Sequence, residues 1–183
     1  MKKIMSFMLV MMIMLAAIPA HADTFTAKGA FKLDLPDNWE VDTSENDEYS
    51  DPADQYFYLG YMVSEDAVIE MDIAYDDGYA GESLSQMSKS ELSDYQEALK
   101  DWLEDDGDYK ATYVGLYEVG DYSIPFMVFK ISSQRYGDSY YAETLSGGWC
   151  ISFEYYMYYE DDQLTKAGLN ELLDILSTFT PVL

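Results

Sequence analysis

Segments in which apolar and polar residues alternate with a period of two constrain the fold more than any other feature of this sequence. At the first such segment, Phe31, Leu33 and Leu35 alternate with two polar residues, which places three apolar side chains on one face of a strand. Residues 36–38 read Pro-Asp-Asn, the composition of a tight turn, and the alternation resumes at Trp39. We therefore expect a strand, a turn and a return strand here.

Later segments repeat the pattern and predict a sheet. In the segment 67–75, Ile69, Met71 and Ile73 share one face. Gly60, inside the predicted strand 56–63, indicates a bulge or a close backbone approach. The remaining predicted strands lie at 111–117, 122–131, 140–145 and 149–159, with Pro125 at an edge or bulge and Gly147-Gly148 in a hairpin turn before the last strand.

Two segments have helical spacing. Ser83 and Ser88 each have the spacing of a capping box, so the first helix is expected to begin near one of them. Its apolar stripe comprises Leu92, Tyr95, Leu99, Trp102 and Leu103, and residues 105–107 end it. The second helix, capped by Asp161 or Asp162 and closed by Pro181, has the stripe Leu169, Leu172, Leu173, Leu176 and Phe179. This order of elements predicts an α+β fold in which two main helices flank an antiparallel sheet.

The first 22 residues have the features of a secretory signal. Lys2 and Lys3 precede an apolar run at 4–18, and the small-residue site Ala20-His21-Ala22 follows it. We therefore expect cleavage after residue 22, a single domain at 23–183, and a secreted or periplasmic location. No later segment is apolar over the ~20 residues needed to span a bilayer, so we expect no membrane span after signal cleavage.

The composition of the predicted mature chain excludes several kinds of function. All 35 acidic residues remain after cleavage, but the only histidine is lost and two of the 10 basic residues go with it. A serine or cysteine protease-like site and a histidine-ligated zinc site are excluded for this reason. The acidic surface would repel nucleic acid, and no phosphate-binding glycine motif is present. Cys150 has no partner for an internal disulfide and is interpreted as a buried thiol. We assign no catalytic, cofactor-binding or metal-binding residue, and no cofactor.

The segment 31–41, which reads FKLDLPDNWEV, resembles the opening F-x-L-x-L-P-x-x-W of PsbP-like domains. This family includes the extrinsic photosystem II subunit, the Mog family of Ran-binding proteins and many small exported bacterial proteins. The later order of strands, central helix, antiparallel meander and final helix is similar too. The resemblance implies a sheet flanked by helices that serves binding or assembly, with Trp39 in the core and Pro36 in the turn. It carries no functional residue over to this chain.

Acidic residues gather in two clusters, at 42–54 and 104–108. Calcium is the ion that such oxygen-rich clusters would bind. However, alignment of Gly107 or Gly78 with the glycine of an EF-hand loop places Trp102 or Ile73 at the first ligand position. We interpret the clusters as solvated surface, and weak calcium binding stays open as an alternative.

The chain has 18 tyrosines, many of them in predicted strands. Tyrosine suits half-buried strands, but a row of them on an uncovered face would also make a stacking platform. The chemistry left for an enzyme is a carboxylate pair, as in glycoside hydrolysis, but the sequence marks no carboxylate as buried. We therefore expect a non-enzymatic, exported binding or accessory module whose partner is a protein with a basic surface. The alternatives are an extracellular calcium-dependent module and a carboxylate-based glycoside hydrolase.

Overall fold

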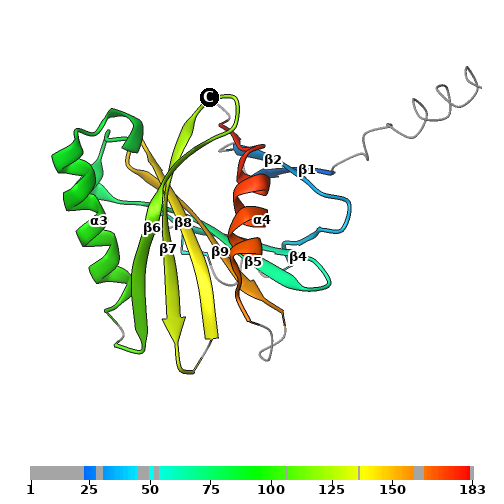
Figure 1. Ribbon diagram of the computed structural model, residues 1–183. Helices are drawn as coiled ribbons and strands as arrows, with labels where there is room; N and C mark the ends of the chain where they lie inside the picture. Colours follow the sequence, from blue (N-terminus) through cyan, green and yellow to red (C-terminus); the bar gives the residue numbers. More distant parts are fainter. Residues whose placement is uncertain are drawn as a thin grey trace, which may run out of the picture.

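The computed structural model describes residues 23–27, 31–44, 50–51, 54–105, 107–135, 137–158 and 163–181. The predicted signal segment, residues 1–22, lies outside this part of the chain. The described residues form a seven-stranded sheet, a three-stranded sheet and two α-helices (Figure 1). No helix in the described part is long and apolar enough to cross a membrane. The predicted α+β class, an antiparallel sheet flanked by two main helices, is confirmed.

The larger sheet has the strand order β3-β4-β5-β9-β8-β7-β6, and all of its neighbouring strands are antiparallel. Its longest-range pairing joins β5 to β9, from Ala67 opposite Met157 to Tyr75 opposite Trp149. Short turns connect most of the other neighbouring strands. The alternation of apolar and polar residues in the sequence predicted nearly all of the strands of this sheet. The strands are β3 (Glu40–Asp42), β4 (Tyr56–Val63), β5 (Ala67–Tyr75), β6 (Tyr109–Val119), β7 (Ile124–Ser133), β8 (Gly137–Ser146) and β9 (Trp149–Met157).

The smaller sheet corrects one prediction. The strand at 31–35 is confirmed as β2, but the expected return strand does not pair with it. Instead, β3 pairs with β4 in the larger sheet, because β2 is already flanked by β1 (Asp23–Ala27) and β10 (Thr180–Pro181). The turn itself is present, since the Trp39 backbone N–H donates to the Pro36 carbonyl at 2.9 Å. Trp39 is 3% exposed, so the side chain enters the core while the chain crosses from one sheet to the other.

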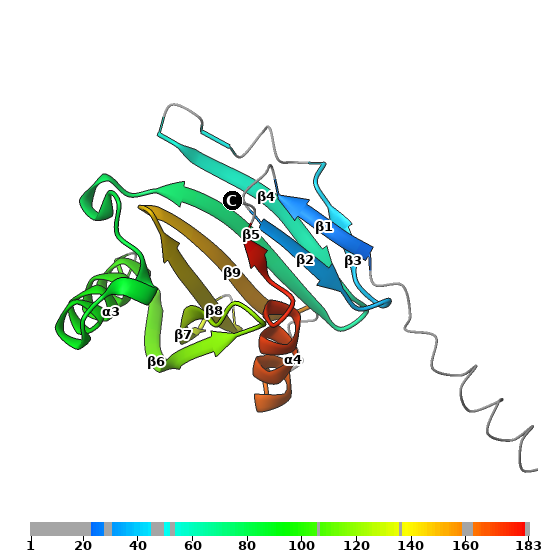
Figure 2. The same cartoon turned by 90° about the horizontal axis from the view of Figure 1, so that it is seen from above.

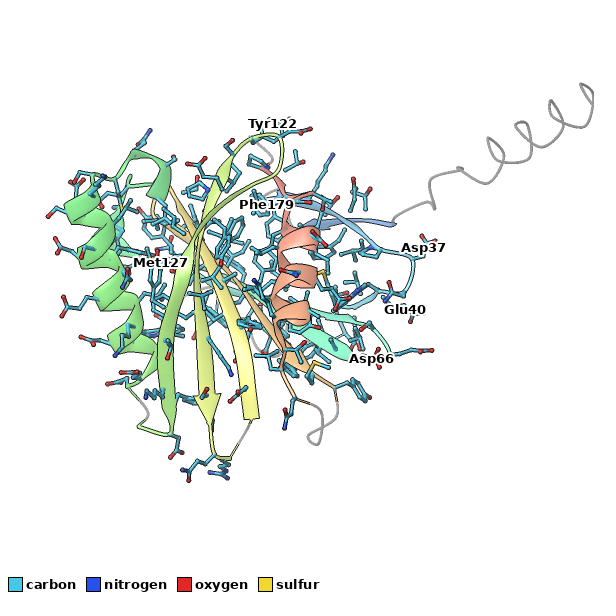
Figure 3. All side chains as sticks on the ribbon, in the orientation of Figure 1. Asp37, Glu40, Asp66, Tyr122, Met127 and Phe179 are labelled. Carbon is cyan, nitrogen blue, oxygen red and sulfur yellow. The ribbon has the colours of Figure 1, made fainter. Side chains whose placement is uncertain are left out.

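The main core lies between the larger sheet, helix α4 (Lys166–Leu176) and the smaller sheet. Four phenylalanines, three from strands and one from the segment between α4 and β10, form its centre, with ring centroids between 5.0 and 6.4 Å apart and mostly edge-to-face geometry. They are Phe31, Phe126, Phe153 and Phe179, the last of which lies beside α4 in Figure 3. The predicted face of Ile69, Met71 and Ile73 is buried in this core. Figure 2 shows that α4 and the smaller sheet lie on the side of the larger sheet opposite α3.

Helix α3 (Lys89–Leu103) covers part of the other face and begins at the predicted capping box. The Ser88 backbone N–H donates to Glu91 Oε2 at 2.6 Å, and the Glu91 N–H donates back to Ser88 Oγ at 3.4 Å. Tyr95 and Leu99 are buried against the sheet, as predicted. Trp102 was expected in this core but is 64% exposed, because its ring packs beside Tyr141 on one side only.

Ser83 and the second helix depart from the predicted caps. Ser83 precedes only the short 3-10 helix η2 (Leu84–Gln86), and its Oγ accepts from the Gly147 N–H at 2.9 Å. A second 3-10 helix, η1, spans Asp77–Tyr79. The cap of α4 is Thr165, whose Oγ1 accepts from the Ala167 N–H at 3.2 Å, so the prediction of an aspartate cap at 161 or 162 is wrong. Residues 161 and 162 lie outside the described chain. The helix begins later than predicted because Thr165, and not the earlier aspartates, is the capping residue nearest to its apolar stripe.

The predicted irregularities of the strands are confirmed. The register of β4 against β5 shifts between Tyr58 and Gly60, and Gly60 has a φ of 94°. Pro125 pairs with β6, whereas the pairing of β7 with β8 begins only at Met127. Pro125 therefore has a paired strand on one side only. On its other side the missing N–H costs no ladder hydrogen bond.

A pair of glycines tests how the β6–β7 turn packs against the end of α4. Gly120 and Gly147 have φ values of 68° and 63°, so alanine at either position adopts the same unfavourable conformation. A Cβ at Gly120 would lie 2.5 Å from the Ser177 carbonyl oxygen, whereas a Cβ at Gly147 meets nothing within 4 Å. We expect Gly120→Ala to lower the free energy of unfolding by about 1–3 kcal/mol more than Gly147→Ala. Urea unfolding of both variants measures the difference, and equal losses would contradict this packing.

Candidate functional site

No helix among the described residues lies over one part of the larger sheet. On the α3 side, the apolar contacts of α3 and η2 involve β6, β7 and β8 together with Cys150 at the start of β9, and β4 and β5 extend away from α3 (Figure 2). Met127 marks the covered part, between the sheet and α3 (Figure 3). We call the uncovered part the open face, and define it by seven side chains from three neighbouring strands. They are Tyr56, Tyr58 and Tyr61 on β4, Glu70 and Asp72 on β5, and Glu154 and Tyr156 on β9, of which Tyr58 is itself buried at 2% exposed.

The strand register places carboxylates next to one another on this face. Glu70 lies directly opposite Glu154, and Asp72 lies opposite Ser152. Ser152 in turn lies opposite Glu143 on β8, so a second acidic residue is two strands away from Asp72, across β9. Like charges directly opposite one another in a sheet are destabilising. Ser139 Oγ donates to Glu154 Oε1 at 2.6 Å, which satisfies one oxygen of that carboxylate.

The pKa values of the open-face carboxyls are raised. Burial is the main cause at all three groups, because it disfavours the charged form. For Asp72 the pKa rises to about 6, with a further contribution from the charge of Glu154 and an opposing hydrogen bond with Ser152. For Glu70 the charges of Glu154 and Asp72 add to the effect of burial. The charged forms of these carboxyls are therefore destabilised on the open face, and a bound cation would stabilise them.

Glu143 is the most enclosed of these acids and joins α3 to the sheet. It is 5% exposed. Its Oε1 accepts a hydrogen bond from the Tyr95 hydroxyl of α3, and its Oε2 accepts one from the Tyr141 hydroxyl at 2.6 Å. Burial raises the pKa of Glu143 to about 7, while the two tyrosine hydroxyls oppose the shift. Both oxygens are occupied by protein groups, so Glu143 holds α3 in place.

Cys150 lies beside this group. Its Sγ is 3.6 Å from the Tyr95 hydroxyl, and burial, together with the charge of Glu143, raises the pKa of the thiol to about 12. The prediction of a buried thiol is partly confirmed, since Cys150 is free and half-buried. A thiol with a pKa this high is protonated at neutral pH and is a poor nucleophile.

A cavity of about 280 Å³ lies where the C-terminal end of α3 meets the open face. One carboxylate of the open face, Glu154, takes part in its wall, and the exposed ring of Trp102 forms another part. The wall thus combines aromatic, aliphatic and acidic groups from one helix and three strands. The lining residues are Trp102, Leu103, Asp105, Tyr109, Ile131 and Glu154.

The two acidic clusters predicted from the sequence border this arrangement: Asp42 and Asp51 pair with Tyr61 and Tyr56 of β4, and Asp105 lines the cavity. In the cluster 42–54, hydrogen bonds from the side chain of Ser44 and from its backbone N–H, the latter at 2.8 Å, lower the pKa of Asp42. Residues 45–49 and 52–53 lie outside the described chain. In the cluster 104–108, Glu104 is bound to Lys100 Nζ at 2.6 Å and to the Ala111 N–H at 2.8 Å. Within the described residues, no three acidic, cysteine or histidine side chains converge on a point that could hold a metal ion.

The open-face carboxylates were missed by the sequence reasoning, although the sequence contained a signal for them. Glu70 and Asp72 alternate with the buried face of their strand, and Glu154 does the same between Phe153 and Tyr155. Because one face of the sheet must be core, acids on the other positions are forced onto the opposite face together. Their proximity depends on the pairing of β5 with β9, which alternation does not specify.

These features define a class of α+β protein in which a strongly curved antiparallel sheet is flanked by helices on both faces. Among solved structures, the chain is similar to the solution structure of cyanobacterial PsbP (CyanoP) from Synechocystis sp. PCC 6803. The TM-score is 0.53 at 12% sequence identity, and the match covers 90% of this chain and 95% of that one. The chain therefore has a PsbP-like fold, as the resemblance of segment 31–41 implied. No protein-family model and no curated protein sequence matches the chain.

The buried carboxyls predict a fold that is more stable at mildly acidic pH than at neutral pH. The pKa of Glu143 is raised from 4.5 to about 7 and that of Asp72 from 3.8 to about 6. At pH values between the ordinary and the raised pKa of these two groups, the folded state binds more protons than the unfolded state. The free energy of unfolding therefore falls as the pH rises from about 5 to about 7. We expect a lower melting temperature at pH 7.5 than at pH 5.5.

Glu143→Gln tests the contribution of the most buried group. The amide keeps the shape of the side chain but does not titrate, so the difference in melting temperature between the two pH values should shrink. Glu65→Gln makes the same change of charge at an exposed position in the β4–β5 turn and should leave the difference unchanged. Equal pH dependence in the wild type and Glu143→Gln would contradict the raised pKa.

Proposed function

We propose that this chain is an exported, non-enzymatic binding module that holds a basic segment of a partner protein on the open face. The PsbP-like fold fits an accessory or binding role. The signal-like segment 1–22 supports export. An acidic surface attracts basic partners over a distance of about 8–10 Å at physiological salt, which raises the rate of association.

The observation that carries the proposal is the composition of the uncovered side of the sheet. Among the described residues of β4, β5, β8 and β9 whose side chains face the α3 side, four are acidic and none is lysine or arginine. Folding alone does not favour this arrangement, because the strand register places Glu70 directly opposite Glu154, and like charges in that position repel. A lysine or arginine from a partner would relieve the repulsion and gain a desolvated ion pair.

Tyrosines complete the open face as a binding surface. Tyr56, Tyr61 and Tyr156 are half-buried around the carboxylates. They offer apolar rings for the aliphatic parts of long basic side chains and hydroxyls for hydrogen bonds. Aromatic residues are enriched at protein interfaces for these reasons. A basic segment is therefore a better match to this surface than a bare inorganic cation.

The glycoside hydrolase alternative gains little from the buried carboxyls. Glu143, whose pKa burial raises to about 7, is 5% exposed and accepts hydrogen bonds from two tyrosines. A general acid must reach the leaving group of its substrate. Glu143 is covered by α3, so its raised pKa is explained by its structural position.

A titration with a lysine-rich model peptide tests the proposal. We expect the purified protein to bind such a peptide in calorimetry, with an affinity that falls as salt is added. The double variant Glu70→Gln/Glu154→Gln should weaken binding about tenfold or more, because each carboxylate faces the bound cations at a partly desolvated site. The matched control is Glu65→Gln/Glu97→Gln, which removes two exposed carboxylates elsewhere.

Two outcomes would overturn the proposal. Equal weakening by the open-face and control variants would mean that the peptide binds the general negative charge of the chain. Stabilisation by millimolar calcium of about 5–10 °C, absent with magnesium at matched ionic strength, would favour the calcium-dependent module instead.

A further inference from the structure

The cavity at the end of α3 combines three features that recognise one kind of ligand. Trp102 presents an exposed ring, Leu103 and Ile131 supply aliphatic surface, and Glu154 supplies a carboxylate from the sheet. At about 280 Å³ the cavity is near the lower end of small-ligand pockets. It is large enough for a short aliphatic chain and too small for an extended polymer.

We propose that this cavity is a binding site for an ammonium group carried on an aliphatic chain, either a lysine side chain or a free alkylamine. The aliphatic chain would pack against Leu103 and Ile131, and the ammonium would lie between Glu154 and the face of Trp102. A cation over an indole ring is favoured by the quadrupole of the ring, and tryptophan is the best of the aromatic residues for this contact. Asp105 adds a second negative charge to the lining.

The chemistry of Glu154 favours an ammonium over a guanidinium. Ser139 Oγ already donates to Oε1 of this carboxylate at 2.6 Å. A guanidinium binds best when both carboxylate oxygens are free for its two parallel N–H donors. An ammonium is a point charge that needs only one oxygen, and the remaining oxygen of Glu154 provides it.

The position of Trp102 is also explained by this role. The sequence predicted Trp102 in the core because it follows the stripe of α3, yet it is 64% exposed. Its ring is 6.1 Å from that of Tyr141, which supports it from the sheet side. Because the Trp102 ring packs against Tyr141, its orientation toward the cavity is defined before a ligand binds. Binding therefore costs little side-chain entropy.

The lysine arm of this inference rests on the proposed function, whereas the free-amine arm does not. If a partner presents a basic segment to the open face, one lysine of that segment would reach the cavity, because Glu154 belongs both to the open face and to the cavity wall. The cavity would then anchor the segment, and the open face would hold the rest of it.

Nuclear magnetic resonance of the indole N–H of Trp102 tests the site directly in the wild-type protein. The probes are n-butylamine, which is charged at neutral pH, and n-butanol, which has a similar shape and no charge. We expect saturable shifts at Trp102 with butylamine and an affinity about tenfold higher than with butanol. Trp39 and Trp149 serve as internal references, since neither lines the cavity.

Variants separate the contributions of charge and ring. Glu154→Gln should remove the preference for butylamine over butanol, and Trp102→Ala should weaken both probes, followed through the Tyr109 ring signals. Tyr122→Ala is the control for loss of an exposed aromatic residue, because Tyr122 is 62% exposed and lies in the β6–β7 turn (Figure 3). Tyr122→Ala should change neither affinity.

A pair of blocked peptides, one with a central lysine and one with norleucine, distinguishes the two sources of the ammonium group. Tighter binding of the lysine peptide than of butylamine would assign the site to a partner side chain, and the reverse would assign it to a free amine. Absence of any saturable shift at Trp102, or equal affinity for butylamine and butanol, would overturn the proposal. Glu70→Gln separates it from the proposed function, since that variant should weaken the lysine-rich peptide and leave butylamine binding unchanged.

Discussion

The pairing of β5 with β9 is the interaction on which the rest of the structure depends. It joins the first strands of the chain to the later β6–β9 meander and runs over nine residue pairs, from Ala67 opposite Met157 to Tyr75 opposite Trp149. Its register puts Met71 and Phe153 together in the core and Glu70 and Glu154 together on the other side. A shift by one residue would reverse both faces, burying the acids and exposing the core. Fold and candidate site are therefore set by the same set of backbone hydrogen bonds.

The two faces of the sheet receive unequal cover. One face is closed by α4 and the smaller sheet around four phenylalanines, whereas α3 lies against only part of the other (Figure 2). At the boundary, Glu143 is enclosed and accepts hydrogen bonds from Tyr95 and Tyr141. Beyond it, Glu70 lies directly opposite Glu154, although Tyr58 and Ser139 each provide one of these carboxylates with a hydrogen bond. The first arrangement stabilises the attachment of α3, and the second leaves repulsion that a partner can relieve.

The sequence predicted the elements that depend on local rules. The strands at 56–63 and 67–75, the bulge at Gly60 and the capping box of Ser88 follow from alternation, backbone freedom and cap chemistry. The wrong predictions were those that depend on distant neighbours. Residues 40–42 pair with β4 because both edges of β2 are occupied, and Trp102 is exposed because nothing packs on its outer side. The candidate site was missed for the same reason, since the proximity of its acids arises from pairing across the chain.

We propose that this chain binds a cationic partner at its open face. Mapping of side-chain signals by nuclear magnetic resonance during titration with a lysine-rich peptide tests it most directly. The account predicts that the ring signals of Tyr61 and Tyr156, on the open face, shift together and saturate with one affinity. Tyr113 on β6 and Tyr122 in the β6–β7 turn, which are more exposed than the two half-buried tyrosines, should not move. Shifts spread evenly over all four tyrosines, or confined to Tyr113 and Tyr122, would contradict the account.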